Sequence, residues 1–211
     1  MRLIFFFTVP LIAGNIFQQL YAFVDTLIVG RFLGVEALAA VGCTGSLMFL
    51  MIGFIMGLTT GLSIYTGQRF GAKDEEGVRK SAAACVVLSL ACGIVLTVLG
   101  VALCRSFLVW MQTPAEILEN ADAFITIIYA GTVIGVFFLM QTNIIRALGD
   151  SRTPTIMLAL ALCINIVLEP VAILILGWGV PGAALATIMA QLIGNIICFI
   201  YIMKKVPLLH I

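Results

Sequence analysis

Two carboxylates lie inside long apolar stretches of the chain. Asp25 and Glu169 are the only acids in such stretches, whereas the other eight acids fall between hydrophobic runs. A charged side chain in the middle of a membrane helix costs about 2.5–3.5 kcal/mol on insertion scales. An acid kept there usually faces a protein interior or a watery cavity and marks an ion or substrate path. We therefore interpret Asp25 and Glu169 as functional residues that bind or exchange a cation.

Uncharged polar residues accompany these acids at helical spacing. Asn165 and Glu169 are four residues apart and so share one helix face. Two further sets repeat on single faces, namely Gln18, Tyr21 and Asp25 near the N-terminus and Thr187, Gln191 and Asn195 near the C-terminus. At a rise of ~1.5 Å per residue, Asp25 lies roughly 7 Å from its outer turn, Glu169 about 10 Å and Thr187 about 6–7 Å. The spacing predicts one polar chamber in the outer half of the membrane.

Isolated amides in membrane helices commonly do no more than bond to a neighbouring helix, often for about 0.6 kcal/mol. For Gln18, Gln191 and Asn195 a structural role and a role in the chamber are therefore equally good interpretations. For Asp25 and Glu169 a functional role is favoured, because an amide could fill a structural role at a lower desolvation cost.

The composition identifies an integral membrane protein. The chain has 211 residues, of which 63% are hydrophobic and 10% charged, and its mean hydropathy is +1.22. Soluble domains carry about 25% charged residues. A helix needs about 20 residues to cross the hydrocarbon core, and backbone groups in lipid must be paired within the segment. We predict one all-α domain over residues 1–211, a six-helix transmembrane bundle with spans near 5–29, 38–64, 81–103, 123–144, 155–176 and 183–203.

The distribution of Lys and Arg sets the orientation. One side of the predicted bundle would carry nine of them: Arg2, Arg69, Lys73, Arg79, Lys80, Arg146, Arg152, Lys204 and Lys205. Only Arg31 and Arg105 fall on the other side. We expect both termini to be cytoplasmic, in a multi-pass protein of a bacterial-type inner (plasma) membrane. The predicted connections are a cytoplasmic loop at 67–80, an external connection at 105–122, a cytoplasmic turn at 146–154 and an external turn at 177–182.

Glycine and proline also occur inside the predicted spans. Gly53, Gly57 and Gly61 form a GxxxGxxxG stripe, which predicts a helix-packing face. Pro10 and Pro170 each remove a helical hydrogen bond and predict kinks, which would serve either mobility or static curvature.

Several short motifs, taken in order, cover nearly the whole chain. The first predicted span carries Pro10, Gln18, Gln19, Tyr21, Val24, Asp25, Thr26, Val29 and Gly30. GQRFGAKD (67–74), IRALGDSRTP (145–154), Asn165 with Glu169 and Pro170, and an AALAT run ending at Thr187 follow. This pattern resembles the multidrug and toxic compound extrusion (MATE) transporters. Members of that family have two six-helix bundles, and the chain resembles the N-terminal one, so the second lobe is absent from this chain.

The resemblance implies a cation-coupled antiporter that expels small organic cations with an H⁺ or Na⁺ gradient. It implies that Asp25, Glu169, Asn165 and Thr187 form the cation- and proton-coupling site, able to hold Na⁺ but no other metal. Gln18, Tyr21, Gln191 and Asn195 are the candidate substrate-cavity residues. Many members have Asp where this chain has Glu169. The implied partners are the lipid bilayer, organic cations and a second six-helix lobe from the same gene or a partner subunit, with no nucleic acid and no cofactor.

Two other functions compete with this one. A lipid-linked oligosaccharide flippase of the same superfamily would want basic residues in its cavity, and no Lys or Arg lies within a predicted span. A non-transporting half that serves in membrane assembly would differ in having no coupled transport. We expect no enzyme activity, because the sequence has no GxSxG, HExxH or phosphate-binding glycine loop and its six cysteines show no metal-site spacing. The sequence leaves Na⁺ and H⁺ coupling open.

Overall fold

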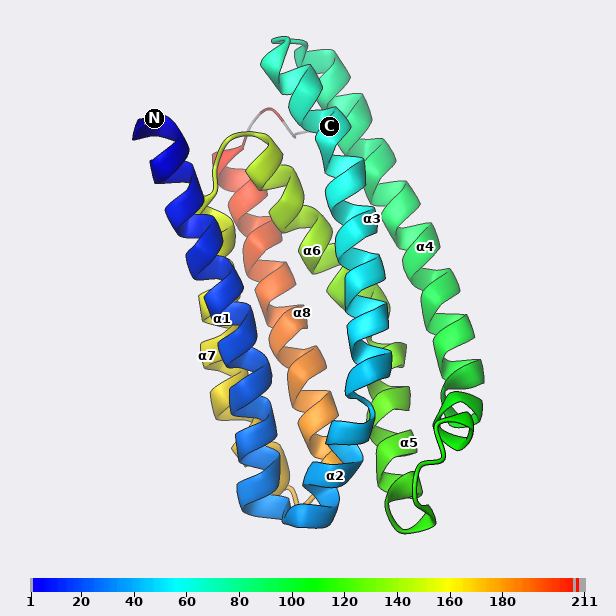
Figure 1. Cartoon of the computed structure of the whole chain (residues 1–211). Helices are drawn as coiled ribbons and strands as arrows, with labels where there is room; N and C mark the ends of the chain where they lie inside the picture. The colour runs from blue at the N-terminus through cyan, green and yellow to red at the C-terminus, as the bar shows by residue number, and fades with distance from the viewer. Residues whose placement is uncertain (1, 207, 209–211) are drawn as a thin grey trace.

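The computed structural model describes residues 2–206 and 208. In the first helix, the side chains of residues 2–7, 9–11, 13, 15, 18, 21 and 22 lie outside that description. The described residues form α-helices and one π-helical turn, without a β-strand (Figure 1). The elements are α1 (Arg2–Leu33), α2 (Val35–Cys43), α3 (Gly45–Gly71), α4 (Glu75–Trp110), α5 (Ala115–Ala130), α6 (Thr132–Ala147), α7 (Arg152–Pro170), η1 (Val171–Ile175) and α8 (Gly179–Lys205).

Two of the predicted spans are each built from a pair of helices. The second consists of α2 and α3, which meet at Thr44, whose hydroxyl donates to the Val41 carbonyl at 2.7 Å. The fourth consists of α5 and α6, which are bent by 48° at a break at Gly131. A Cβ at Gly131 would lie 2.5 Å from the Ile188 side chain, so the break also lets the backbone pass close to α8.

Four segments are long and apolar enough to cross a membrane: α3, α4, α7 with η1, and α8. Counting the bent α5–α6 pair as one span gives up to five. This count covers only the described residues, and many α1 side chains are not among them. The chain is therefore an all-α, multi-pass membrane protein, and six spans with cytoplasmic termini remain a prediction.

The predicted loop at 67–80 is wrong in extent. The helix α3 continues to Gly71 and α4 begins at Glu75, so only residues 72–74 connect them. The Asp74 carboxylate caps α4 by accepting the Gly77 N–H at 2.9 Å, and this hydrogen bond lowers the pKa of Asp74. An aspartate cap with acids in the first turn suits a helix N-terminus, so a charged sequence can still be helical beyond the membrane.

The other two long connections are also shorter than predicted, for the same reason. The segment between α4 and α5 is 111–114, where 105–122 was expected. The segment between α6 and α7 is 148–151, where 146–154 was expected.

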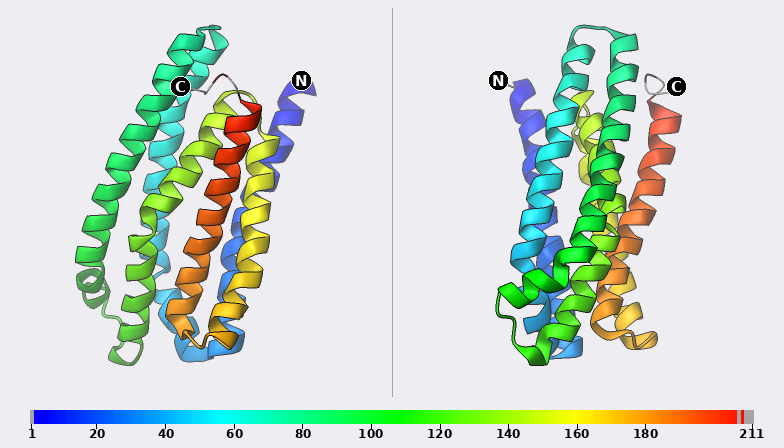
Figure 2. Two further views of the ribbon diagram at one scale, coloured as in Figure 1. Left: turned by 180° about the vertical axis from the view of Figure 1, so that it is seen from behind. Right: turned by 90° about the vertical axis from the view of Figure 1, so that its right-hand side faces the viewer.

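The helices form a bundle in which α8 lies between α6 and α7 (Figures 1 and 2). The helix α7 packs against α1 and α8, while α6 packs against α3, α4 and α8. The N-terminal end of α1 and the C-terminal end of α8 lie at the same end of the bundle (Figure 1). The opposite end holds the largest apolar core, which includes the fully buried Val29, Leu108 and Ile125. This arrangement brings side chains of α1, α7 and α8 together.

The glycine stripe of α3 does not pack against the described part of the chain. A Cβ added at Gly53, Gly57 or Gly61 would meet no atom within 4 Å. By contrast, a Cβ at Gly100 would lie 1.9 Å from the Tyr129 ring. Within the described part of the chain the stripe is therefore open, and the predicted packing face has no partner helix there.

Candidate functional site

Four polar residues from three helices converge in the bundle. The Asn165 amide on α7 donates to the Thr187 hydroxyl on α8 at 3.3 Å. The Thr187 Oγ1 lies 3.5 Å from Asp25 Oδ1 on α1 and 3.1 Å from its own helix carbonyl at Ala183. One hydroxyl proton serves only one of these two acceptors at a time. The hydroxyl is therefore a weak and exchangeable partner for the Asp25 carboxyl group.

Glu169 on α7 completes this cluster. Its side chain is fully buried, and no amide, hydroxyl or basic group of the described residues donates to either carboxyl oxygen. Its carboxyl group lies beside that of Asp25, close enough for the two to hydrogen bond when one of them carries a proton. The Asn165 Oδ1 likewise has no donor. We call Asp25, Asn165, Glu169 and Thr187 the carboxyl cluster.

Basic side chains do not compensate the carboxyl cluster. Among the described residues the ion pairs are Arg69–Asp74, Lys80–Glu76 and Arg105–Asp122, none of which involves the two buried acids. Buried polar atoms are nearly always paired, so three buried oxygens at one place that find no donor among the described residues call for an explanation. Two neighbouring carboxyl groups resist simultaneous ionisation. A proton shared between the two carboxyl groups, or a bound cation, would give the buried oxygens a partner and would also remove the repulsion between two carboxylates.

The backbone beside Glu169 is irregular. At Pro170 the α-helix gives way to the π-helical turn η1, in which the Leu176 N–H bonds to the Val171 carbonyl at 3.1 Å. Proline has no N–H, so the preceding turn loses one hydrogen bond, and π-turns occur frequently at functional sites. The predicted disruption at Pro170 is confirmed. The helix α1 continues through Pro10, whose side chain is not described.

The C-terminal polar stripe of α8 divides between two neighbours. Thr187 joins the carboxyl cluster, but Asn195 donates to the Ile134 carbonyl on α6 at 2.8 Å and accepts from Gln141 at 3.2 Å. Gln191 lies between them, half-buried, with its Oε1 close to Gly135 of α6. Asn195 thus serves as a buried link between α6 and α8, away from the acids.

Two further predicted cavity residues cannot be placed in this way. The side chains of Gln18 and Tyr21 lie outside the described residues. The α1 backbone puts their Cα atoms about 10 Å and 6 Å along the helix from that of Asp25.

Sequence reasoning missed one charged residue of the interior. Arg146 was placed in a turn, but it belongs to the last turn of α6 and is half-buried. Its Nη1 donates to Asn143 Oδ1 at 3.4 Å, its Nε has no acceptor, and no described acid pairs with it. Because Arg146 lies in the last turn of α6, at the end of that helix, the expectation that no Lys or Arg lies within a span stays a prediction. Gln141 and Asn143, which precede it in an apolar helix, were the available signal.

Arg146 lies far from the carboxyl cluster. Its Nη2 is 3.5 Å from the position that a Cβ at Gly14 would take. Gly14 and Asp25 are separated by about 16 Å along α1. The interior is thus electrically polarised, with acids near one end of the bundle and a guanidinium near the other.

Comparisons with known proteins identify the family. Residues 10–171 match the family model MatE. The probable multidrug resistance proteins YoeA and YpnP of Bacillus subtilis (strain 168) are 33% identical over 203 residues and 32% identical over 202 residues. Each match covers 94% of this chain and 44% of the relative. The chain therefore spans less than half the length of these relatives.

Solved structures agree with the sequence matches. An outward-facing multidrug resistance MATE family transporter of the MOP superfamily aligns with a TM-score of 0.87 and 31% identity, over 94% of this chain and 44% of that one. A MOP superfamily transporter from Pyrococcus furiosus Vc1 (DSM3638), described as having a binding pocket of reverse polarity, aligns with a TM-score of 0.87, 32% identity and the same coverage. The chain is a member of the MATE transporter family.

Proposed function

We propose that this chain is the N-terminal six-helix lobe of an H⁺- or Na⁺-coupled antiporter that exports organic cations across a bacterial plasma membrane. Its family membership and the multidrug resistance proteins among its relatives support export of drugs. The coverage of 44% of those relatives supports a second lobe, either in the same gene or in a partner subunit. The Lys and Arg distribution supports cytoplasmic termini.

The observation that carries the coupling proposal is the carboxyl cluster. Glu169 is fully buried, neither of its oxygens has a donor in the part of the chain that the structure describes, and Asp25 is its neighbour. Because both carboxyl groups cannot comfortably ionise together, the pair holds a proton unless a cation replaces it. Binding of one cation and release of the other are therefore linked, which is what an antiporter requires.

The same atoms fit a sodium ion. Carboxylate, amide and hydroxyl oxygens are the ligands that hard cations prefer. Glu169 and Asn165 present oxygens without donors, and Asp25 and Thr187 add others at their side. The carboxyl cluster therefore offers a mixed set of carboxylate, amide and hydroxyl oxygens to a cation.

The alternative cargo, an anionic lipid-linked oligosaccharide, is less well supported. Arg146 is a basic group of the interior, but it stands alone and lies about 16 Å along α1 from the acids. An anion would also be repelled by the carboxyl cluster.

The test uses the complete transporter, with both lobes, in liposomes. An organic cation should be exchanged when either a pH gradient or a sodium gradient is imposed alone, and the effective gradient identifies the coupling ion. Asp25→Asn should abolish the exchange at normal membrane insertion, while Glu119→Gln, an exposed acid on α5, should not alter it. Wild-type exchange by Asp25→Asn would show that the coupling proposal is wrong.

The neutral members of the carboxyl cluster give a second comparison. Asn165→Ala and Thr187→Ala each remove an uncharged oxygen, so both should weaken coupling more than folding. A double variant with full coupled transport would return these residues to a structural role. This chain alone should show no coupled transport, because the proposed substrate path needs the second lobe, and robust transport by a demonstrated monomer would contradict the two-lobe proposal.

A further inference from the structure

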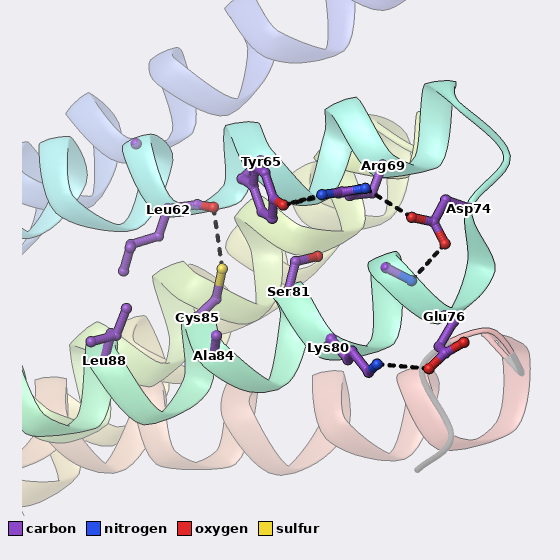
Figure 3. A pocket seen from close by; sticks show the side chains of 12 residues that line it. Leu62, Tyr65, Arg69, Asp74, Glu76, Lys80, Ser81, Ala84, Cys85 and Leu88 are labelled. Carbon is purple, nitrogen blue, oxygen red and sulfur yellow. Dashed lines mark hydrogen bonds and ion pairs between the residues drawn. The ribbon is translucent and has the colours of Figure 1, made fainter.

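A groove lies between the ends of α3 and α4 that residues 72–74 connect. Its volume is about 640 Å³, and Figure 3 shows its side chains. The groove is remote from the carboxyl cluster, which α1, α7 and α8 form. Nothing in the proposed coupling mechanism uses it.

The lining changes from apolar to charged along the helices. Toward the middle of the bundle it consists of Gly61, Leu62, Ala84, Cys85 and Leu88. Toward the connecting turn it consists of Tyr65, Arg69, Asp74, Glu76, Lys80 and Ser81, with Gly77. The polarity therefore follows the direction in which a membrane changes from hydrocarbon to head groups, and tyrosine and basic residues are typical of that boundary.

The charged part of the groove is electrically balanced. Arg69 Nη1 lies 3.0 Å from Asp74 Oδ2, and Lys80 Nζ lies 2.7 Å from Glu76 Oε1 (Figure 3). The Lys80–Glu76 pair is about three-quarters exposed, and such pairs contribute little to stability. They can therefore open and rebind to another molecule that offers both charges.

The apolar part of the groove adjoins the glycine stripe of α3, which we call the glycine furrow because its three residues carry no side chain. Gly61 lines the groove and is followed down α3 by Gly57 and Gly53, and a Cβ at any of them would meet no atom within 4 Å. This side-chain-free track runs for about 12 Å from Gly61 to Gly53. A flexible hydrocarbon chain could lie along it without displacing any side chain.

We propose that the groove and the glycine furrow bind a zwitterionic phospholipid whose head group carries a primary ammonium. The phosphate contacts Arg69 and Lys80, the ammonium contacts Asp74 and Glu76, and one acyl chain lies along the furrow. The occupant follows from charge. Two cations and two anions suit a head group with one of each, whereas an anionic head group would leave the two carboxylates opposed to it.

A choline head group fits less well for two reasons. A quaternary ammonium has no N–H to donate to a carboxylate. The aromatic face that could attract it, the Tyr65 ring, is already occupied by the Arg69 guanidinium at 5.0 Å.

The test is native mass spectrometry of the intact protein, extracted in mild detergent and given equal amounts of phosphatidylethanolamine, phosphatidylcholine and phosphatidylglycerol with identical acyl chains. We expect phosphatidylethanolamine to be retained about tenfold over the other two. The double variant Arg69→Gln, Lys80→Gln should lose that preference. Arg79→Gln should keep it, because Arg79 precedes Lys80 on the same helix but does not line the groove. Equal retention of the three lipids, or equal loss in Arg79→Gln, would overturn the proposal.

A second pair of variants tests the furrow. Gly57→Leu fills it with a better helix former, so the fold should persist while phosphatidylethanolamine retention falls at least fivefold. Gly42→Leu is the matched control, since a Cβ there also meets nothing within 4 Å but lies on α2. If Gly57→Leu leaves lipid retention unchanged and instead prevents association with the second lobe, the furrow holds a helix and the lipid assignment is wrong.

Discussion

Replacing Glu169 by glutamine should stabilise the fold and remove cation coupling at the same time. Glutamine has nearly the same shape as glutamate, so packing around this fully buried side chain is kept. The new amide brings two N–H donors, whereas the two carboxyl groups of the wild type share a single proton. Two acceptors lie in the same cluster. Asn165 Oδ1 has no donor among the described residues, and the Asp25 carboxyl group has only the weak Thr187 hydroxyl.

The magnitude follows from the unsatisfied atoms. A buried acceptor left without a donor costs about 1–3 kcal/mol. One new amide hydrogen bond should therefore recover about 2 kcal/mol. For a protein of roughly 150–250 residues each kcal/mol shifts the Tm by about 2–4 °C, so an increase of about 4–8 °C is expected.

The assay is thermal unfolding in detergent with sodium concentration and pH varied separately. A ligand at a hundred times its Kd stabilises the native state by about 2.7 kcal/mol. The wild type should therefore gain Tm with whichever cation it binds, and Glu169→Gln should start higher and gain nothing. Glu119→Gln is the matched control, because it makes the same chemical change at an exposed position on α5.

Either of two results would refute this reasoning. A lower Tm for Glu169→Gln would mean that the carboxylate has partners that the structure does not show. An unchanged response to cations would mean that Glu169 takes no part in the site. In transport by the complete protein, a double variant with Asp25→Asn should be no worse than Asp25→Asn alone, because the two acids act as one unit.

Three further predictions concern the fold. Asp150→Ala should lower stability by about 1–2 kcal/mol, measured by chemical unfolding, because its carboxylate caps the first turn of α7 through two backbone N–H groups. Partial burial raises the pKa of Asp150, but the hydrogen bonds to its carboxylate lower it by more, so the pKa is lowered overall. The stabilisation should therefore be present above about pH 4 and be lost as the pH falls further. Gly100→Ala should lower the free energy of unfolding by about 1–3 kcal/mol, because the new methyl group would overlap the Tyr129 ring of α5. Gly57→Ala adds a methyl group in open space and should leave stability unchanged or raise it. Equal Tm values for the two variants would contradict this prediction. Cysteines placed at 72–74 should react with a membrane-impermeant reagent only from the cytoplasmic side and those at 177–178 only from outside, and the reverse pattern would invert the orientation.

The convergence of the acids could be predicted because helix geometry fixes both face and depth. Asn165 and Glu169 share a face at a spacing of four, and a rise of about 1.5 Å per residue placed Asp25 and Thr187 at a similar depth. These two quantities need only the sequence and the span ends. The structure then puts the hydroxyl of Thr187 within 3.5 Å of Asp25.

The sequence does not predict which helix packs against a given face of another helix. Thr187 and Asn195 lie on one face of α8, yet the first meets α1 and α7 and the second meets α6. A long helix such as α8 has different neighbours along its length, and sequence periodicity does not identify them. The open glycine stripe of α3 shows the same limit, because small residues predict close packing without naming the partner.

The residues at which helices begin and end were also not predicted correctly from the sequence. Charged residues marked changes in hydropathy along the sequence, but they did not end the helices. The helix α4 begins at Glu75 because Asp74 caps it, and α6 extends through Arg146 to Ala147. A boundary of polarity is set by the solvent, whereas a helix end is set by caps and backbone angles, so the two need not coincide.

The position of the carboxyl cluster separates cation binding from transport. All four of its residues come from α1, α7 and α8 of this chain, so we expect the proposed cation site to require no atom of a second lobe. The drug path, by contrast, is proposed to run between two lobes. It follows that this chain alone, if it folds, should show a cation-dependent Tm that Glu169→Gln abolishes, while showing no transport. A cation response that appears only after the second lobe is added would mean that the site is incomplete here, and that the unpaired oxygens of Glu169 find their partner across the interface.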